Sequence, residues 1–247
     1  MAKNLDKEGL SSIVDNYQLF YVDLWGVVHN GITLYEEAIK VLKEFSKKKK
    51  DYVLLTNAPR PNSSVKYFLE RLGMEESIRN HVFSSGQAAL NYLKKNFSEK
   101  YFFHIGPPRD FDLFKDFKNM KVDSLESSEY LLCTGLFDDH DSDLVYYKKI
   151  FENYLDKKMI CTNPDLIVDR GKVRELCAGS IAMVFEKMGG EVIYFGKPYP
   201  EVYNQAINYQ NKKILSIGDN LNTDIKGANL LNFDSLIISN GIHKNEI

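Results

Sequence analysis

The chain has 247 residues, of which 44% are hydrophobic and 27% are charged, and its formal net charge at pH 7 is −2. This is the composition of an ordinary globular protein, and the length suits one large domain or a domain that carries an insertion. The 32 basic residues are balanced by 34 acidic ones, which argues against a nucleic-acid partner. No apolar stretch approaches the ~18 residues of a transmembrane helix, which argues against a membrane partner. We therefore expect a cytoplasmic protein.

From the N-terminus onward, short apolar runs alternate with segments whose apolar residues recur at helical spacing. We predict strands over residues 18–25, 51–57, 100–106, 129–135, 158–163, 192–196, 213–219 and 234–239. We predict helices over residues 35–50, 63–73, 86–96, 142–158, 178–190, 200–210 and 223–231. Alternation of this kind is typical of an α/β fold, with a Rossmann-like, mainly parallel sheet and crossover helices on both of its faces.

Four of the predicted strands end in polar residues that are able to do chemistry. These residues are Asp23, Thr56 with Asn57, Lys197 and Asp219. Because ligands bind beyond the carboxyl ends of the strands in an open parallel sheet, we expect the four strand ends to converge on one crevice. Each segment by itself has a simpler explanation, such as a capped turn or a surface lysine, so the functional interpretation depends on their combination.

The separation of these segments along the chain predicts two domains. Thr56 and Lys197 are about 140 residues apart, which is too long for a single crossover and long enough for a second domain. That interval has its own alternation of strands and helices. We therefore expect a core domain made of residues 1–79 and 191–247, with residues 80–190 inserted as an α/β cap domain over the crevice.

The converging residues suit phosphoryl transfer. Asp23 and Asp219 would supply two carboxylates from different strands, a hard oxygen site of the kind that Mg²⁺ prefers. Lys197 would add a fixed positive charge, while the Thr56 hydroxyl and the Asn57 backbone amide would donate to a phosphate. Charge neutralisation and positioning are what phosphoryl transfer needs from a protein, and Asp23 could act as the nucleophile through an aspartyl-phosphate.

Five segments resemble motifs of the haloacid dehalogenase superfamily, in its class IIA group with a type-2 cap. They are DLWGV with the later HNG, LLTNAPR, FGKPYPEVY, SIGDNLNTDIKGA and, in the insertion, CTNPDLIV, which resembles the cap segment that faces the active site. The resemblance spans nearly the whole chain. The group includes phosphatases of sugar phosphates, nucleotides and para-nitrophenyl phosphate, so the resemblance implies a phosphatase with Mg²⁺ as cofactor and a small phosphorylated metabolite as substrate.

The resemblance also implies roles for individual residues in the core. Asp23 would be the nucleophile and a Mg²⁺ ligand. Thr56 and Asn57 would hold the transferring phosphoryl group, and Lys197 would bridge the phosphate and Asp23.

The remaining roles concern the metal and the cap. By the resemblance, Asp219 and the backbone carbonyl of Trp25 would also ligate Mg²⁺, and Asp224 would support the ion directly or through Asn220. Asn163, Pro164 and Asp165 in the cap would lie near the leaving group of the substrate.

The chain departs from the family pattern at Trp25, where the family has a second aspartate. In the family, the side chain of that aspartate protonates the leaving oxygen and later activates water. Trp25 keeps the backbone carbonyl but loses the carboxyl, and an indole N–H has no useful acidity. General acid–base catalysis contributes ~10²–10⁴-fold to a rate, so the replacement predicts slower hydrolysis without loss of metal or phosphate binding.

Several interpretations stay open from the sequence. Trp25 is either an apolar plug or a stacking platform for an aromatic or sugar substrate. His29, in the loop that follows, either substitutes for the missing carboxyl through a water or is a turn histidine without a role. Positively charged residues of the cap either contact an anionic substrate or face only solvent, and these are Arg170, Lys172 and Arg174.

Two functions from different classes fit the motifs. The first is a phosphatase of a small organic phosphate ester, such as a sugar phosphate or nucleotide. The second is a catalytically impaired pseudo-enzyme that acts as a phospholigand-binding or regulatory module, which Trp25 favours. A dinucleotide-binding oxidoreductase is disfavoured because no G-x-G-x-x-G follows a strand. A homodimer is compatible with both functions.

Overall fold

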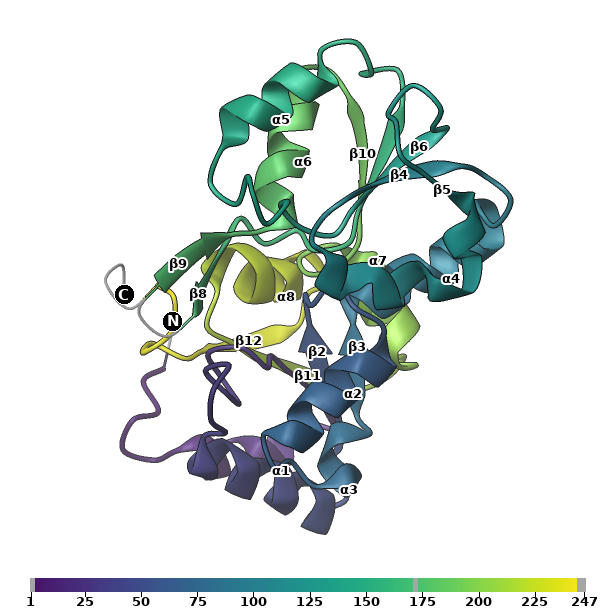
Figure 1. Cartoon of the computed structure of the whole chain (residues 1–247). Helices are drawn as coiled ribbons and strands as arrows, with labels where there is room; N and C mark the ends of the chain where they lie inside the picture. The colour runs from purple at the N-terminus through teal and green to yellow at the C-terminus, as the bar shows by residue number, and fades with distance from the viewer. Residues whose placement is uncertain (1–2, 171–172, 244–247) are drawn as a thin grey trace.

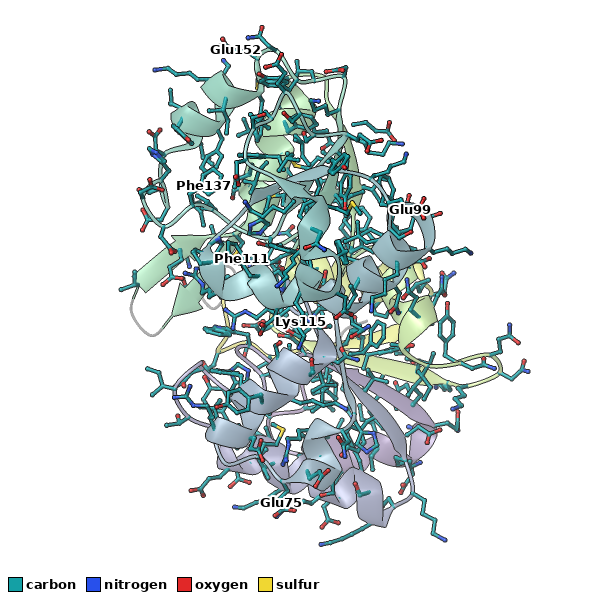
Figure 2. The ribbon with its side chains drawn as sticks, turned by 45° about the vertical axis from the view of Figure 1, so that its right-hand side comes forward. Glu75, Glu99, Phe111, Lys115, Phe137 and Glu152 are labelled. Carbon is teal, nitrogen blue, oxygen red and sulfur yellow. The ribbon has the colours of Figure 1, made fainter. Side chains whose placement is uncertain are left out.

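The structure is a computed structural model that describes residues 3–170 and 173–243, with the backbone alone described at Arg170. Figure 1 shows two halves, each built from a sheet and its helices, one above the other. Figure 2 places Glu152 at the outer end of one half and Glu75 at the outer end of the other. Lys172 lies outside the described residues.

The first half is built on a five-stranded parallel sheet in the order β12-β11-β1-β2-β3. All four residues of its central strand are buried, as expected of a parallel strand that is covered on both faces. Three helices cover one face of this sheet (Figure 1). The strands are β1 (Leu19–Val22), β2 (Asp51–Thr56), β3 (Val82–Ser84), β11 (Ile214–Gly218) and β12 (Asp234–Ile237), and the helices are α1 (Glu36–Lys47), α2 (Asn62–Arg71) and α3 (Glu76–Arg79).

Local sequence explains where these helices begin and end. α1 has Glu36 and Glu37 in its first turn and Lys47 in its last, which complements the helix dipole at both ends. Its apolar residues face the sheet, with Leu42 and Phe45 fully buried. Gly73, with a φ of +88°, turns the chain after α2 in the left-handed conformation that glycine adopts most readily.

The second half contains another five-stranded parallel sheet, in the order β10-β7-β6-β4-β5. α5 and α6 cover its outer face, and a two-stranded antiparallel hairpin, β8–β9, extends from it toward the first half (Figure 1). The strands are β4 (Phe102–Ile105), β5 (Lys121–Val122), β6 (Tyr130–Cys133), β7 (Lys158–Cys161), β8 (Ile167–Arg170), β9 (Val173–Leu176) and β10 (Glu191–Tyr194), and the helices are α4 (Ser85–Asn96), α5 (Leu144–Phe151) and α6 (Ala178–Lys187).

The structure confirms the predicted α/β fold with an inserted cap, and each of the eight predicted strand ranges overlaps a strand. Sequence reasoning missed the short strands β3 and β5 and the hairpin β8–β9. Two predicted helices end early: α5 stops at Phe151, and α7 (Pro200–Ala206) stops before residue 207, which is extended. The last predicted helix begins as a π-helical turn, Leu221–Ile225, before α8 (Lys226–Leu230).

Strand pairing moves both predicted domain boundaries toward the C-terminus. β3, at residues 82–84, pairs with β2 and therefore belongs to the first sheet and not to the insertion. β10, at residues 191–194, pairs with β7 and therefore belongs to the second sheet and not to the core. Both errors have one cause, because a short strand at a domain crossing carries no local signal of which sheet it joins.

The two halves share one apolar cluster. It joins Tyr21 and Leu55 of the first sheet to Phe102 and Tyr130 of the second, through α4, α7 and the 3₁₀ segment Pro108–Met120. Leu93 of α4 lies within this cluster. The cap is therefore attached to the core by packed apolar surface as well as by two chain crossings. Among the described residues, no helix is long and apolar enough to cross a membrane.

We predict that Leu93→Ala destabilises both halves together. Leu93 is 1% exposed, so its truncation should lower the free energy of unfolding by ~2–5 kcal/mol. Urea unfolding followed by far-UV circular dichroism and by the fluorescence of Trp25 should give one coincident transition. The control Leu230→Ala removes a side chain that is 58% exposed and should change stability by less than ~0.5 kcal/mol. Two separated transitions would show that the halves unfold independently.

Candidate active site

The structure brings the predicted polar residues together at one edge of the first sheet. Asp23 directly follows β1, Thr56 ends β2 and Asp219 directly follows β11, so adjacent parallel strands deliver all three to the same edge. Lys197 reaches the same place by another route, because it lies on the crossing that follows β10 of the second sheet. All of these residues are buried, as is Asn57.

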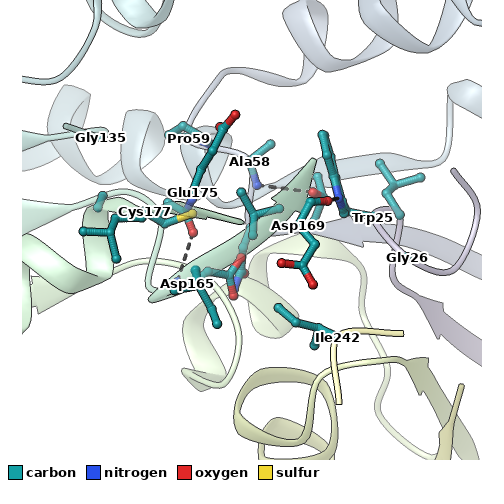
Figure 3. A pocket seen from close by; sticks show the side chains of 18 of the residues that line it. Trp25, Gly26, Ala58, Pro59, Gly135, Asp165, Asp169, Glu175, Cys177 and Ile242 are labelled. Atoms are coloured by element: carbon teal, nitrogen blue, oxygen red, sulfur yellow. Dashed lines mark hydrogen bonds between the residues drawn. The ribbon is translucent and has the colours of Figure 1, made fainter. Parts of the chain in front are cut away.

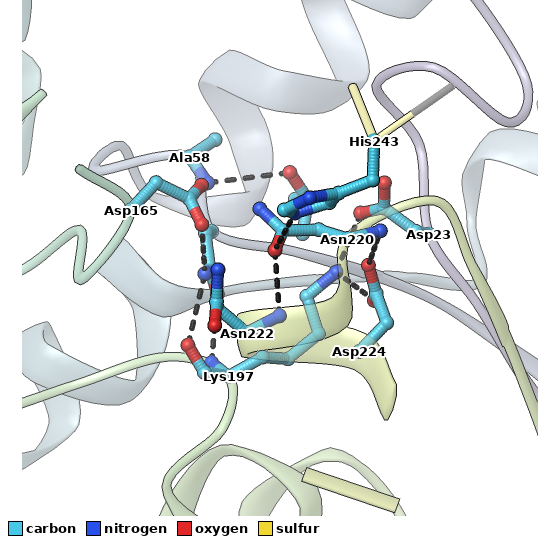
Figure 4. Close-up of polar contacts among 10 residues, drawn as sticks. Asp23, Ala58, Asp165, Lys197, Asn220, Asn222, Asp224 and His243 are labelled. Atoms are coloured by element: carbon cyan, nitrogen blue, oxygen red, sulfur yellow. Dashed lines mark hydrogen bonds and ion pairs between the residues drawn. The ribbon is translucent and has the colours of Figure 1, made fainter. Parts of the chain in front are cut away.

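Lys197 is the ionic centre of the site. Its Nζ lies 2.5 Å from Asp23 Oδ1 and 2.7 Å from Asp224 Oδ1, as Figure 4 shows. Burial opposes the charged ammonium, but Asp224 and Asp23 outweigh that effect and hold the pKa of Lys197 above its usual range. Lys197 is therefore a permanent positive charge between two carboxylates.

A third carboxylate completes the cluster. Asp23, Asp219 and Asp224 each offer an oxygen, and these oxygens lie within 4.8 Å of one another. Burial raises the pKa of Asp23 well above its usual value despite the neighbouring Lys197, and burial raises that of Asp219 to about 6. One ammonium does not supply enough positive charge to hold three buried carboxylates ionised, so this donor set fits a small divalent cation with oxygen ligands.

The Trp25–Gly26 segment lies against this cluster. Gly26 has a φ of +83°, and a Cβ at that position would stand 2.1 Å from Asp219 Oδ2. Only glycine lets the backbone approach the carboxylate so closely. The peptide after Trp25 therefore borders the cluster, which is the placement that a metal-ligating Trp25 carbonyl requires.

The side chain of Asn57 connects the core to the cap. Its Nδ2 donates to Asp165 Oδ1 at 2.9 Å and to the Lys197 carbonyl at 3.0 Å, while its Oδ1 accepts from the Lys197 N–H at 2.7 Å. Asn163, in the same cap segment as Asp165, uses its Oδ1 to accept the Asp165 N–H at 3.0 Å. The predicted cap residues therefore lie at the site, and the Asn57 side chain is occupied by protein partners.

Trp25 forms part of the wall between the core and the cap. Its Nε1 donates to the backbone carbonyl of Asp169 in β8 at 2.9 Å, and Figure 3 shows the two residues side by side. The indole also covers Gly31, where a Cβ would stand 2.5 Å from the ring. Sequence reasoning left a plug and a stacking platform open for Trp25 and missed this contact with the hairpin, because the hairpin itself was not predicted.

His29 is placed as a structural residue. It is buried edge-on to Trp25 with ring centroids 5.2 Å apart, and its Nδ1 accepts the Gly31 N–H at 3.0 Å. Burial lowers the pKa of His29 to about 4, so the ring is neutral near pH 7. Because Nδ1 is the acceptor, the single ring proton lies on Nε2, and the ring has no free lone pair with which to activate water.

A cavity of about 880 Å³ opens above the cluster, with walls from both halves. Two arginines of its lining are held by carboxylates: Arg60 Nε lies 2.8 Å from Asp110 Oδ1, and Arg174 Nε lies 2.8 Å from Asp169 Oδ1. A cavity of this size accommodates a small ligand, and pockets of ~300–1,000 Å³ are usual for such ligands. Arg174 thus borders the cavity and is already paired with Asp169.

We predict that Lys197→Met strongly destabilises the protein in the absence of divalent cations. Removal of one partner from a buried ion pair costs ~3–5 kcal/mol, because the remaining charges lose their compensation. The free energy of unfolding should be measured at pH 7 with a chelator present. The control Lys94→Met breaks an exposed ion pair with Asp116 and should cost less than ~1 kcal/mol. Equal stability of the two variants would contradict the central role of Lys197.

Comparisons with known proteins agree with this arrangement. A family model described as haloacid dehalogenase-like hydrolase matches residues 20–118, and a second, described as HAD-hydrolase-like, matches residues 194–247. The solved structure of a haloacid dehalogenase-like hydrolase from Brucella suis 1330 has a TM-score of 0.86 and 31% identity, covering 95% of this chain and 89% of that one.

Two further relatives are named as phosphatases. Phosphoglycolate phosphatase 2 from Arabidopsis thaliana is 24% identical in an alignment of 271 positions, gaps included. The alignment covers 96% of this chain and 88% of that protein. Glycerol phosphate phosphatase from Mycobacterium tuberculosis, solved in complex with magnesium, has a TM-score of 0.70 and 23% identity, covering 93% of this chain and 70% of that one. The chain therefore belongs to the haloacid dehalogenase-like hydrolases, with the inserted cap expected of the class IIA group.

Proposed function

We propose that this enzyme is a Mg²⁺-dependent phosphatase that hydrolyses a small organic phosphate ester through an aspartyl-phosphate on Asp23. The observation that carries the proposal is the buried cluster in which Asp23 lies beside Lys197 and within reach of Asp219 and Asp224. A nucleophile placed against a fixed ammonium and a cation site meets the main requirement of phosphoryl transfer, which is charge neutralisation.

The proposed mechanism gives each residue of the cluster a role. Mg²⁺ would be held by Asp23, Asp219, Asp224 and the Trp25 carbonyl. Its charge would keep the buried Asp23 ionised and would offset the charge of the phosphate. Thr56 Oγ accepts the Ala58 N–H at 3.2 Å, so its own hydrogen is free to donate to a phosphate oxygen. The backbone N–H of Asn57 and the ammonium of Lys197 would hold further oxygens. An oxygen of Asp23 then attacks phosphorus, and water later releases phosphate.

The substrate is proposed to be a small phosphorylated metabolite. The relatives named above act on phosphoglycolate and glycerol phosphate, whose leaving groups have two or three carbons. Sugar phosphates and nucleotides are larger members of the same substrate class. The cavity of about 880 Å³ has room for any of them, so its volume does not discriminate among these esters.

The second candidate is a pseudo-enzyme that binds a phospholigand and does not turn it over. The specific observation in its favour is Trp25, which supplies no carboxyl and whose N–H is tied to the Asp169 carbonyl. The observation against it is the position of Asp23, because phosphate binding alone does not need a nucleophile beside Lys197.

We predict that the protein releases phosphate from at least one small ester in a Mg²⁺-dependent reaction. The measurement is phosphate release from phosphoglycolate, glycerol phosphate and para-nitrophenyl phosphate, with Mg²⁺ or with a chelator. Asp23→Asn should reduce turnover by on the order of 10⁴-fold or more, because it removes the nucleophile. Mg²⁺-dependent binding of phosphate without hydrolysis of any ester would instead favour the pseudo-enzyme.

We also predict that Asp219→Asn weakens Mg²⁺ binding by at least ~10-fold, since it removes one of the carboxylates that face the cation. Isothermal titration calorimetry at pH 7 measures this directly. Asn can still accept the hydrogen bond that the Ile242 N–H now donates to Asp219 Oδ2 at 3.0 Å, so the fold should persist. The control Asp138→Asn changes an exposed carboxylate paired with Arg109 and should leave the affinity intact. Unchanged Mg²⁺ affinity in Asp219→Asn would refute the assigned cation site.

A further inference from the structure

This inference rests on the proposed function and concerns the proton that the reaction must move. Cleavage of an ester requires a proton for the leaving oxygen, and hydrolysis of the aspartyl-phosphate requires a base for the attacking water. The indole of Trp25 can serve in neither step, and the neutral His29 ring uses its lone pair on the Gly31 N–H. The proton relay must therefore come from elsewhere in the cavity.

Several carboxylates of the cavity wall are committed to arginines. Arg60 holds Asp110, Arg109 holds Asp138 and Arg174 holds Asp169, each with a contact of 2.8 Å. In each of these pairs the guanidinium occupies a carboxylate oxygen that would otherwise be available to a substrate. Asp165 differs, because the one hydrogen-bonding partner of its carboxylate among the described residues is the neutral amide of Asn57, which meets Oδ1 at 2.9 Å. Its Oδ2 is left for a ligand.

The loop that carries Asp165 is held firmly. The Asp165 N–H donates to Asn163 Oδ1 at 3.0 Å, and the Asp165 carbonyl accepts from the Gly179 N–H at 3.1 Å. A Cβ at Gly179 would stand 2.3 Å from the Pro164 carbonyl oxygen, so the start of α6 lies directly against this loop. A carboxylate fixed in this way has the positional precision that proton transfer requires.

Asp165 also lies on the side of the site that faces the cap. A chain of contacts connects Asp165 to Asp23. The Asp165 carboxylate accepts from the Asn57 amide, and Asn57 Oδ1 accepts from the Lys197 N–H. The Nζ of the same lysine contacts Asp23. Figure 4 shows Asp165 and Asp23 on opposite sides of this chain of contacts. In an in-line displacement the leaving group departs on the side opposite to the nucleophile, which here is the cap side.

The surroundings of Asp165 suit a group that both donates and accepts a proton. Burial raises the pKa of Asp165 to about 6, against the opposing effects of Lys197 and of the Asn57 hydrogen bond. Asp224 and Asp219 add to the increase. The other titratable groups that face it are the Cys161 and Cys177 thiols, whose own pKa values are raised by burial, so both thiols remain neutral. A pKa near the working pH is the best compromise between the two roles.

We propose that Asp165 is the general acid and base of this enzyme and replaces the carboxyl that the family carries at position 25. In the first step a bond forms between Asp23 and phosphorus, the bond from phosphorus to the leaving oxygen breaks, and that oxygen takes the proton of Asp165. In the second step water attacks phosphorus and gives its proton to the Asp165 carboxylate. The bond between phosphorus and Asp23 breaks, which regenerates both carboxyl groups.

The decisive variant is Asp165→Asn, which keeps an oxygen to accept the Asn57 N–H and removes the proton. With glycerol phosphate, whose alkoxide leaving group needs the acid, kcat/KM should fall by ~10²–10⁴-fold. Aspartyl-phosphate formation from para-nitrophenyl phosphate, whose leaving group needs no acid, should fall much less. The pH dependence of kcat/KM should also lose the limb near pH 6 that Asp165 contributes. Asp138→Asn, the matched control within the cavity, should behave as the wild type.

Rescue provides a readout that a structural role cannot produce. The double variant Trp25→Asp with Asp165→Asn restores a carboxyl at the family position and should recover much of the glycerol phosphate activity. Equal losses with both esters and an unchanged pH profile in Asp165→Asn would instead assign Asp165 to the positioning of Asn57, and wild-type activity in that variant would remove it from the mechanism.

Failure of this inference can be distinguished from failure of the proposed function. If the wild type hydrolyses no ester but Trp25→Asp does, the site is a phosphatase site and Asp165 does not relay protons, so the inference is overturned alone. If neither protein hydrolyses any ester although both bind Mg²⁺, the proposed function is overturned and the inference falls with it.

Discussion

The burial of three carboxylates around a single ammonium is the constraint on which the rest of this structure depends. Asp23, Asp219 and Asp224 come together with Lys197 as the one ammonium that pairs with them among the described residues. Removing ions from water costs several kcal/mol each, so such a cluster does not stabilise the fold by itself. It is held by the apolar strands beneath it and by the close approach of Gly26 to Asp219. A divalent cation would supply the positive charge that Lys197 alone does not provide.

The second constraint is that neither half of the molecule forms the site alone. Asn57 of the core bonds to Asp165 of the cap, and Trp25 bonds to the Asp169 carbonyl in the hairpin. Beneath these polar contacts, one apolar cluster continues from the first sheet through α4 to the second. The two halves are therefore joined both by polar contacts at the site and by packed apolar side chains.

The sequence predicted the parts of this design that have local signals. The apolar runs located eight strands, and the polar residues at the ends of β1, β2 and β11 converged because parallel strands share one edge. The motifs predicted the family, which the comparisons confirmed. The strand β3 was missed because its three residues carry too little periodicity, and β8 and β9 were missed because charged residues interrupt their apolar runs.

What the sequence could not provide were contacts between distant segments. Trp25 and Asp169 are 144 residues apart, and nothing near Trp25 indicates that its N–H meets a cap carbonyl. The state of His29 depends on a backbone N–H at Gly31 and on burial by residues from other elements. The use of the Asn57 side chain by Lys197 and Asp165 is likewise a property of the folded chain.

The most direct test of the account is chemical trapping of the phosphorylated protein. The protein should be mixed with para-nitrophenyl phosphate in the presence of Mg²⁺, quenched in acid and analysed by peptide mass spectrometry. The account predicts one phosphoryl group on the peptide that contains Asp23, absent when a chelator replaces Mg²⁺ and absent in Asp23→Asn. Hydrolysis of the ester that persists in Asp23→Asn, or a phosphoryl group on a different residue, would contradict it.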